Sequence, residues 1–374
     1  MKTVKSLRVL YRDRLVGTLA LTREKKIAIE YAPEWLEDGF SISPFSLPLE
    51  KGVFLPSKSY FNGLFGVFAD SLPDAWGNIL LNRVLRKYHI SPDELSALDR
   101  LSIVGSSGMG ALTYEPETRM TLPENDVSLD VLARECSNIL ASKESDELDV
   151  LYRLGGTSGG ARPKITKEAD GKSWIIKFPA RIDGASAGKM EYEYSLCAKQ
   201  CGIQMTETRL FPSGECDGYF GIERFDRSEG QRIHMLTAAA LLELNFEEPS
   251  LDYHSLMKLT IILTRDSGAE MEEMYRRMCF NVYAHNRDDH SKNFTFLYHE
   301  PEDSWRLSPA YDLTYSTTYY GEHTTSVDGN GKNPSKRELM NVGRKAGLSK
   351  GRCEERLEQV KSCVDAMLGK YIQG

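Results

Sequence analysis

The sequence lacks the cysteine spacing of a zinc module or of a secreted disulfide framework. Its seven cysteines are scattered, their number is odd, and no two of them form a CxxC pair. Cys197 and Cys201 stand four residues apart on a predicted helix and could share a metal ion. Because no histidine lies near them, we interpret both as buried thiols.

Long hydrophobic runs are also absent. A membrane-spanning helix needs roughly 20 consecutive apolar residues, and no stretch of the chain approaches that length. The first residues, "MKTVKSLRVLYRDRLVGTL", alternate charged with apolar residues and contain no uninterrupted signal-peptide core. We therefore expect a cytoplasmic protein with no membrane partner.

Positive charge is scarce as well. Among 374 residues, 47 Lys and Arg face 54 Asp and Glu, so the net charge is −7. This balance disfavours a protein whose main task is to grip nucleic acid through its phosphates, although it leaves room for a DNA-binding partner. The length exceeds what one hydrophobic core usually serves, which predicts two or three subdomains.

The first part of the chain has the pattern of a mixed α/β unit. Residues 4–30 show the period-two alternation of short strands, with charged turns at "RDR" and "TREKK". Residues 61–88 change to a helical period, which places the following side chains on one face: Leu80, Leu81, Val84, Leu85 and Tyr88. A Ser-Pro-x-Glu arrangement typical of a helix N-cap follows at 91–94. Residues 105–117 predict a glycine-rich turn that leads into a strand.

The rest of the chain predicts a second unit, in which helices become more frequent toward the C-terminus. Its expected elements are an amphipathic helix within 118–150, a strand, glycine-rich loop and strand pair over 152–180, a helix over 189–203 ended by Gly202, and a hairpin over 207–227. From residue 235 onward helical periodicity dominates, and the chain closes on the helix "KGRCEERLEQVKSCVDAML".

A glycine-rich loop lies in the segment "LGGTSGGARPK". Thr157 and Ser158 are flanked by four glycines, which are Gly155, Gly156, Gly159 and Gly160. Glycines let backbone N–H groups approach a bound anion, and hydroxyl groups add further donors. No Lys-Ser/Thr pair follows at the spacing of a Walker sequence, and taken alone the segment fits an ordinary hairpin loop as well as an anion site.

A lysine occupies an apolar strand in "SWIIKF". Trp174 and Ile176 define one face of this strand, and Lys177 lies on the other. The predicted helix that follows offers Glu191 and Glu193. A strand lysine bridged to a helix glutamate is how protein kinases hold the ATP phosphates. The alternative is a lysine at a solvent edge that extends its ammonium group into water.

The most polar cluster of the chain is "NRDDHSKN". Asp288 and Asn293 are five residues apart, which is the interval between the catalytic aspartate and the metal-binding asparagine of protein kinases. Nineteen residues after Asn293, "LSPAYDLTYS" supplies Asp312 at the end of a predicted strand, in the place of the kinase DFG aspartate. Together with the glycine loop and the strand lysine, four elements follow in the kinase order, and such an ordered set is far less frequent by chance than any one of them.

Other uses of the cluster stay open at this point. His285, Asp288 and His290 could form a metal site, although histidines five apart do not share a helix face cleanly. Asp289 is also interpretable as a turn carboxylate, and His290 as a structural hydrogen-bonding residue. We favour the kinase interpretation, with Asp289 and His290 bracing the loop.

The motifs "GGARPK", "IIKFP", "IERFDR", "NRDDHSKN" and "PAYDL" resemble those of the HipA family of bacterial serine/threonine kinases, nearly end to end. The resemblance implies an α+β fold with a protein-kinase-like two-lobed core, made of a β-rich N-lobe and a helical C-lobe, and an additional N-terminal α/β subdomain. It implies three domains, with the N-terminal subdomain at 1–125, the N-lobe-like region at 126–227 and the helical C-lobe at 228–374.

The resemblance also implies roles in catalysis and metal binding. Asp288 would be the catalytic aspartate, and Lys292 would lie near the transferred phosphate. Asn293 and Asp312 would hold Mg2+.

Further residues would bind ATP. Lys177 would contact the phosphates, with Glu191 as its helix partner and Glu193 as the alternative, while Glu223 and Phe225 would form the hinge at adenine. The phosphate loop would comprise Gly156, Thr157, Ser158, Gly159 and Gly160. Family members autophosphorylate a serine of this loop. Thr157 stands at that serine's usual place with Ser158 beside it, so both are candidates for autophosphorylation.

The function implied by the resemblance is that of an ATP- and Mg2+-dependent toxin kinase of a toxin–antitoxin pair, which phosphorylates a translation component such as an aminoacyl-tRNA synthetase. The implied partner is a helix-turn-helix antitoxin of the HipB type. Since no helix-turn-helix pattern is evident in this chain, we expect DNA contact only through that antitoxin. The alternatives are a pseudokinase scaffold or corepressor, which the intact site residues disfavour, and a small-molecule kinase with a similar core.

Overall fold

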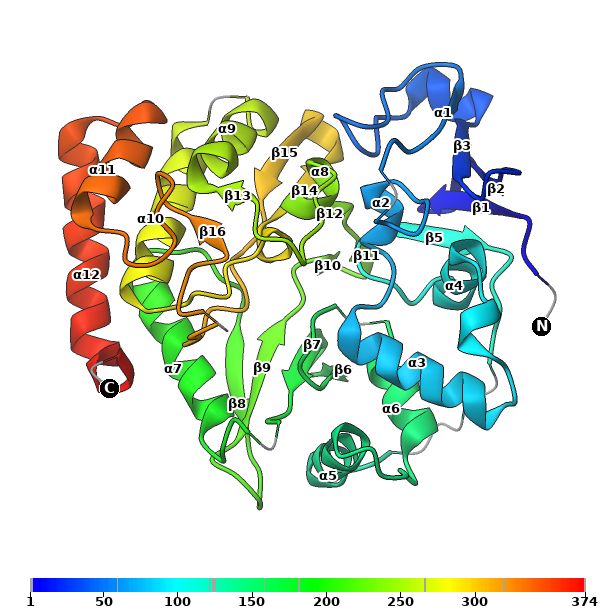
Figure 1. Ribbon diagram of the computed structural model, residues 1–374, viewed down its shortest axis with the longest axis horizontal. Coiled ribbons are helices and arrows are strands. Elements are labelled where there is room, and N and C mark those ends of the chain that lie inside the picture. Colours follow the sequence, from blue (N-terminus) through cyan, green and yellow to red (C-terminus); the bar gives the residue numbers. More distant parts are fainter. Residues whose placement is uncertain are drawn as a thin grey trace. The chain divides into compact units, whose positions relative to one another are not determined.

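The structure of the protein is a computed structural model, and its elements form two compact units (Figure 1). It describes residues 3–58, 60–120, 122, 126–157, 159–180, 182–265, 267–318 and 320–372. The first unit comprises Met1–Gly188, Phe211–Leu236 and Ala240–Glu243, and the second comprises Lys189–Leu210, Thr237–Ala239 and Leu244–Gly374.

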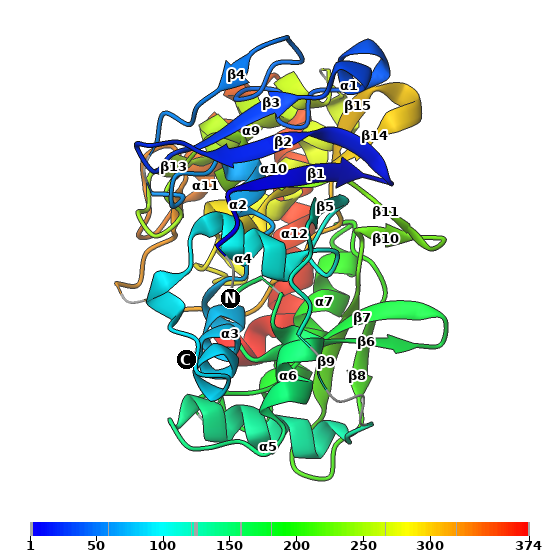
Figure 2. The same cartoon turned by 90° about the vertical axis from the view of Figure 1, so that its right-hand side faces the viewer.

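The first unit begins with an antiparallel five-stranded sheet in the order β4-β3-β2-β1-β5 (Figure 2). Its strands are β1 (Ser6–Tyr11), β2 (Arg14–Leu21), β3 (Ile27–Tyr31), β4 (Val53–Phe54) and β5 (Leu112–Glu115). The two-residue turn between β1 and β2 places Arg12 and Asp13 at φ of 46° and 65°, as in a type I′ hairpin. The strands and the "RDR" turn expected from the alternating pattern are confirmed.

The helices of the first unit are α1 (Pro33–Asp38), α2 (Gly66–Ala69), α3 (Ala75–Lys87), α4 (Ala97–Val104), α5 (Leu129–Leu140), α6 (Leu148–Gly155) and the 3-10 helix η1 (Pro92–Glu94). Helix α3 contributes one face to a hydrophobic core. The predicted apolar face of α3 is buried at Leu80, Leu81, Val84 and Leu85. It packs with α5, α6 and the strands β6 (Lys164–Ala169) and β7 (Lys172–Lys177) in one core.

Three sequence predictions for this unit need correction. Tyr88 is 45% exposed, because α3 ends at Lys87 and Tyr88 is already its C-cap. Ser91 makes no side-chain capping hydrogen bond, and the capping box lies five residues later, where Ser96 and Asp99 begin α4. The residues before the glycine loop form α6 and not a strand, since the apolar spacing that starts at Leu148 has a helical period.

The second sheet of the chain has the strand order β6-β7-β9-β8. Its later strands are β8 (Thr208–Phe211) and β9 (Tyr219–Glu223), so the hairpin predicted over 207–227 is confirmed as neighbouring strands. Strand β7 pairs antiparallel with β6 and with β9, and Trp174 lies opposite Glu223. A short hairpin of β10 (Arg227–Ser228) and β11 (Gln231–Arg232) follows.

The second unit is mainly helical. Its helices are α7 (Ala187–Gln200), α9 (Tyr253–Leu263), α10 (Gly268–Tyr283), α11 (Lys336–Lys345) and α12 (Lys350–Ile372), with the 3-10 helices η2 (Ser291–Asn293) and η3 (Glu300–Glu302). The short helix α8 (Ala238–Leu241) is divided, since Ala240 and Leu241 belong to the first unit. Helix α12 packs along α10 (Figure 1). The predicted helices at 189–203 and at the end of the chain are confirmed, and Gly202 has a φ of 80° just past α7.

Short strands interrupt this helical unit. They are the antiparallel pair β14 (Thr295–His299) and β15 (Ser304–Leu307) and the parallel pair β13 (Leu251–Asp252) and β16 (Thr325–Ser326). Strand β12 (Met235–Thr237) has its first two residues in the first unit. The β14–β15 hairpin was not predicted, because helical periodicity dominates around it. Among the residues that the structure describes, no helix combines the length and apolar character that a membrane crossing requires.

A buried ion cluster ties the segment after β9 to the glycine-rich turn before β5. The Asp226 carboxylate is fully buried and accepts hydrogen bonds from Arg224 and Arg227 at 2.6–2.9 Å. Arg227 and Arg232 also donate to backbone carbonyl groups of the turn at 106–110. Burial alone would raise the pKa of Asp226, but its arginine partners hold that pKa below the usual value, so the carboxylate stays charged.

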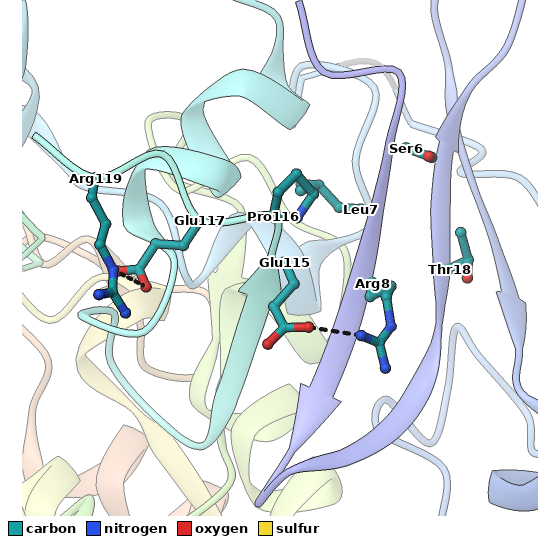
Figure 3. Close-up of a pocket in the computed structure, with 8 residues that line it drawn as sticks. All are labelled: Ser6, Leu7, Arg8, Thr18, Glu115, Pro116, Glu117 and Arg119. Carbon is teal, nitrogen blue, oxygen red and sulfur yellow. Dashed lines mark hydrogen bonds and ion pairs between the residues drawn. The ribbon is translucent and has the colours of Figure 1, made fainter.

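We predict that Asp226→Ala lowers the free energy of unfolding by about 3–5 kcal/mol, because it leaves buried guanidinium groups unpaired. Glu115→Ala is the matched control. It breaks the exposed Arg8–Glu115 ion pair of 2.9 Å (Figure 3) and should cost less than about 1 kcal/mol. Urea unfolding followed by circular dichroism measures both. Equal losses in the two variants would contradict the structural role of the buried cluster.

Candidate active site

The polar cluster of the sequence forms a loop that follows α10. The chain leaves this helix through His285, whose φ of 52° turns the backbone sharply. The two adjacent aspartates then enter opposite environments, since Asp288 is exposed and Asp289 is only 1% exposed.

Asp289 anchors the loop through its buried carboxylate. It accepts hydrogen bonds from the Tyr253 hydroxyl at 2.9 Å, from Nδ1 of His323 at 3.0 Å and from the backbone N–H of Thr325 at 3.0 Å. A carboxylate only accepts, so the imidazole carries its hydrogen on Nδ1. Asn281 donates to the Tyr253 hydroxyl at 2.9 Å and extends the network to α10. Burial, followed by the nearby Asp289 charge, raises the pKa of Tyr253 well above its usual value, so this hydroxyl remains a donor.

Backbone hydrogen bonds hold the same loop on two sides. The carbonyl of His285 accepts from the N–H of Ser316 at 3.0 Å, and the carbonyl of Arg287 accepts from the N–H of Thr324 at 3.0 Å. The loop therefore lies between the segments around 316 and 324. Because both segments also belong to the second unit, the position of Asp288 is determined within one compact body.

We predict that Asp289→Ala lowers the free energy of unfolding by about 3–5 kcal/mol, since three buried donors lose their acceptor. Asp288→Ala is the matched control one residue away. Because its carboxylate is exposed, this substitution should change the free energy of unfolding by no more than about 0.5 kcal/mol. Urea unfolding of both variants tests the assignment, and a larger loss for Asp288→Ala would reverse the roles of the two aspartates.

The side-chain amide of Asn293 is oriented by Asp288. Its Nδ2 donates to the Asp288 carbonyl oxygen at 2.7 Å, so the other atom of the amide, Oδ1, is the one suited to a cation. The hydroxyl of Tyr311 donates to the Lys292 carbonyl at 2.6 Å, which brings the residue before Asp312 onto the same short helix η2.

Asp312 has a left-handed backbone with a φ of 52°. A non-glycine residue adopts this conformation only when its surroundings hold it there. Asn286 of the loop donates to the Asp312 carbonyl at 3.4 Å and to Oδ1 of Asn281 at 2.9 Å. Asp312 does not stand at a strand end as predicted, because β15 already ends at Leu307. The structure thus brings the segments of Asp288, Asn293 and Asp312 together.

Lys292 has an aromatic partner that sequence reasoning missed. Its ammonium nitrogen lies 4.3 Å from the centroid of the Phe246 ring, which is a cation–π geometry. The same ring lies 6.0 Å from the His290 ring, and Nδ1 of His290 accepts the Lys292 N–H at 3.2 Å. In the sequence, Phe246 is the only aromatic residue of the stretch "LELNFEEPS". This stretch has no periodic pattern that would indicate a functional role for Phe246.

Lys177 lies at the end of β7 in the first unit. The predicted alternation is observed, since Trp174 and Ile176 are buried and Lys177 is half-buried. Its ammonium nitrogen lies 5.7 Å from the Phe220 ring centroid. Glu223 is engaged by the Lys172 ammonium at 3.0 Å.

The two glutamates predicted as partners of Lys177 differ in environment within the second unit. Glu191 is 6% exposed, whereas Glu193 pairs with Lys370 and accepts from the Tyr371 hydroxyl at 3.0 Å. The Lys370 hydrogen bond is the main cause that lowers the pKa of Glu193. Since Glu193 already pairs with residues of α12, Glu191 is the better candidate for the partner of Lys177. This pairing stays a prediction.

The glycine loop follows α6 directly. Gly160 has a φ of 85°, and Thr157 donates its hydroxyl hydrogen to the Ser107 carbonyl at 3.0 Å. Ser158 lies outside the described residues. Phe225, the second hinge candidate, follows the end of β9 and is half-buried.

No group of three or more His, Cys, Asp or Glu side chains in the described part of the chain is arranged to hold a metal ion. Cys197 and Cys201 are fully buried thiols, as interpreted from the sequence. An Asn293 and Asp312 pair is nevertheless compatible with Mg2+, which commonly takes one or two protein oxygens and completes its shell with water and phosphate.

Comparison with known proteins gives two matches that cover most of the chain. The model of the HipA-like C-terminal domain matches residues 156–367, and the model of the HipA N-terminal domain matches residues 7–115. The chain belongs to the HipA family.

Relatives of this HipA family member support the same assignment. It is 28% identical over 302 residues to "Putative kinase Y4dM" of Sinorhizobium fredii, covering 74% of this chain and 72% of that protein. It is 24% identical over 346 residues to "Putative kinase Y4mE" of the same species, covering 85% and 79%.

A solved structure shares the fold. HipA of Shewanella oneidensis MR-1, in its complex with HipB and operator DNA, superimposes with a TM-score of 0.72 over 98% of this chain and 91% of that chain at 18% identity. At this identity the likeness shows the fold alone. The predicted fold class, with a protein-kinase-like core and an N-terminal α/β subdomain, is confirmed.

Proposed function

We propose that this HipA family member is an ATP- and Mg2+-dependent serine/threonine protein kinase that acts in the cytoplasm as the toxin of a toxin–antitoxin pair. The observation that carries the proposal is the loop at 285–293. There, the exposed Asp288 is followed by the buried and hydrogen-bonded Asp289. The side-chain amide of Asn293 donates to the Asp288 carbonyl. Phosphoryl transfer needs positioning and charge neutralisation more than covalent help from the protein, and this loop supplies positioning.

Each predicted site residue has a place in this mechanism. Asp288 orients the acceptor hydroxyl and accepts its proton, and Lys292, steadied by Phe246, lies beside the transferred phosphate. Asn293 and Asp312 would hold Mg2+, which neutralises charge on the phosphates when bound.

The ATP-binding roles are those that the family resemblance implies. Lys177 would contact the phosphates with Glu191 behind it, and the hinge at 223–225 would meet adenine. The loop at 156–160 would enclose the phosphates. The three-part division at 125/126 and 227/228 remains a prediction.

The candidates for autophosphorylation are Thr157 and Ser158. The Thr157 hydroxyl already has an acceptor in the Ser107 carbonyl, so its phosphorylation requires that hydrogen bond to break. Phosphoamino-acid analysis separates the two residues.

The proposed partner is a helix-turn-helix antitoxin of the HipB type, through which the kinase would associate with operator DNA. The support is the fold shared with Shewanella HipA, whose structure contains HipB and operator DNA. An aminoacyl-tRNA synthetase as the substrate is carried over from the family resemblance alone.

We predict that Asp288→Asn lowers kcat for transfer to a protein acceptor by at least about 100-fold, because the amide cannot accept the hydroxyl proton. Binding of Mg-ATP, measured by calorimetry, should stay within about twofold, since the exposed side chain carries little of the nucleotide affinity. Near wild-type transfer by Asp288→Asn would show that the catalytic assignment is wrong. A wild-type protein that binds no Mg-ATP would support a pseudokinase scaffold instead.

A further inference from the structure

The beginning of α3 is unusual because its N-cap residue serves another segment. Asp74 makes no side-chain capping hydrogen bond to its own helix. Its Oδ2 instead accepts the N–H of Gly160 at 2.8 Å, 86 residues away in sequence and at the end of the glycine loop. A carboxylate at an N-cap ordinarily bonds the first turn, so this choice of partner needs an explanation.

Trp76 holds the same part of the loop. Its backbone N–H donates to the Gly160 carbonyl at 3.3 Å, and its indole Nε1 donates to the Lys164 carbonyl at 3.1 Å. The Trp76 side chain is fully buried, so packing fixes the position of both donor groups. Both the N–H and the carbonyl of Gly160 are therefore bound by the start of α3.

Gly77 brings the helix backbone against the beginning of the loop. A Cβ atom added there would lie 2.7 Å from the carbonyl oxygen of Gly156 and 2.6 Å from Cβ of Pro73. No side chain fits at such distances without a backbone shift, so glycine permits the close approach.

Lys164 completes the support of the loop. It is 5% exposed and donates its ammonium hydrogen to the Gly159 carbonyl at 2.6 Å. Hydrogen bonds thus hold Gly160 through Asp74 and Trp76, and Gly159 through Lys164, while Gly156 lies close against Gly77. All of these contacts lie within the first unit.

We propose that Asp74, Trp76 and Gly77 are positioning residues for the glycine loop, through which the N-terminal subdomain prepares the phosphate site for ATP. The inference rests on the proposed kinase function. A loop with four glycines loses much conformational freedom when it orders around a ligand. If the loop is already held, ATP binding does not bear that cost, and the nucleotide affinity is higher.

The test compares three variants for Mg-ATP affinity by calorimetry and for KM and kcat in transfer. Asp74→Ala removes a charge-assisted hydrogen bond and should raise Kd and KM for ATP about tenfold, with a smaller change in kcat. In Asp74→Asn, Kd and KM for ATP should stay within about threefold of the wild-type values, because the amide oxygen of the new side chain accepts the same Gly160 N–H. Asp149→Ala is the matched control, since this carboxylate joins α6 to Lys87 at the far end of α3, 2.6 Å away, and its loss should leave the ATP affinity unchanged.

Hydrogen exchange gives a readout that does not involve nucleotide. Amides of the peptide 155–164 should exchange about tenfold faster in Asp74→Ala than in wild type or Asp149→Ala. Both alanine variants can lose the same amount of melting temperature. If the KM for ATP then rises in Asp74→Ala alone, Asp74 has a positioning role and not a merely structural one.

The outcomes that overturn the inference are distinct from those that overturn the kinase function. Unchanged exchange and unchanged ATP affinity in Asp74→Ala, with a wild type that binds Mg-ATP, refute the positioning role alone. Tighter ATP binding by Asp74→Ala also refutes it and shows that the carboxylate competes with phosphate for the Gly160 N–H. A wild type that binds no Mg-ATP refutes the proposed function together with this inference.

Discussion

The buried carboxylate of Asp289 is the interaction on which the candidate active site depends. Burying a charge is costly unless it is paired or fully hydrogen-bonded, and here a tyrosine, a histidine and a backbone N–H meet that requirement. Those partners come from α9 and from the segment that leads to β16, so satisfying one charge draws three parts of the second unit together. Asp288 is exposed as a consequence, since its neighbour takes the buried position.

In the first unit, carboxylates order glycine-rich segments at two places, of which Asp226 is buried and Asp74 half-buried. The buried Asp226 gathers Arg224 and Arg227 and, with Arg232, fixes the glycine-rich turn before β5. Asp74 takes a backbone N–H of the second glycine loop. Glycine-rich segments have little apolar surface to bury, so carboxylates and guanidinium groups provide the order that packing cannot.

The periodic parts of the chain were predictable from sequence because burial on one face imposes their pattern. Strands β1 to β3, the apolar face of α3 and the long α12 follow from periods of two and 3.6 residues. The strand predicted from Tyr152 onward is wrong, because only the second half of α6 lies there and these few residues do not show a helical period.

The candidate site was only partly predictable. The interval between Asp288 and Asn293 indicated a kinase loop, and Asp289 was interpreted as a brace. Asp289 braces the loop through hydrogen bonds with Tyr253 and His323. Both residues lie more than 30 positions away in the sequence, and no sequence pattern links them to Asp289. Phe246 was missed for the same reason, because a ring that contacts Lys292 through space leaves no spacing to detect. Tertiary hydrogen bonds and ring contacts of this kind require coordinates.

The central claim, that this HipA family member transfers phosphate to a protein hydroxyl, is tested most directly by incubating the purified protein with γ-labelled ATP, Mg2+ and a cell lysate. We predict one labelled acceptor protein in addition to any labelled kinase, with the label on serine or threonine after acid hydrolysis. Label confined to small molecules, or no transfer at all, would contradict the account.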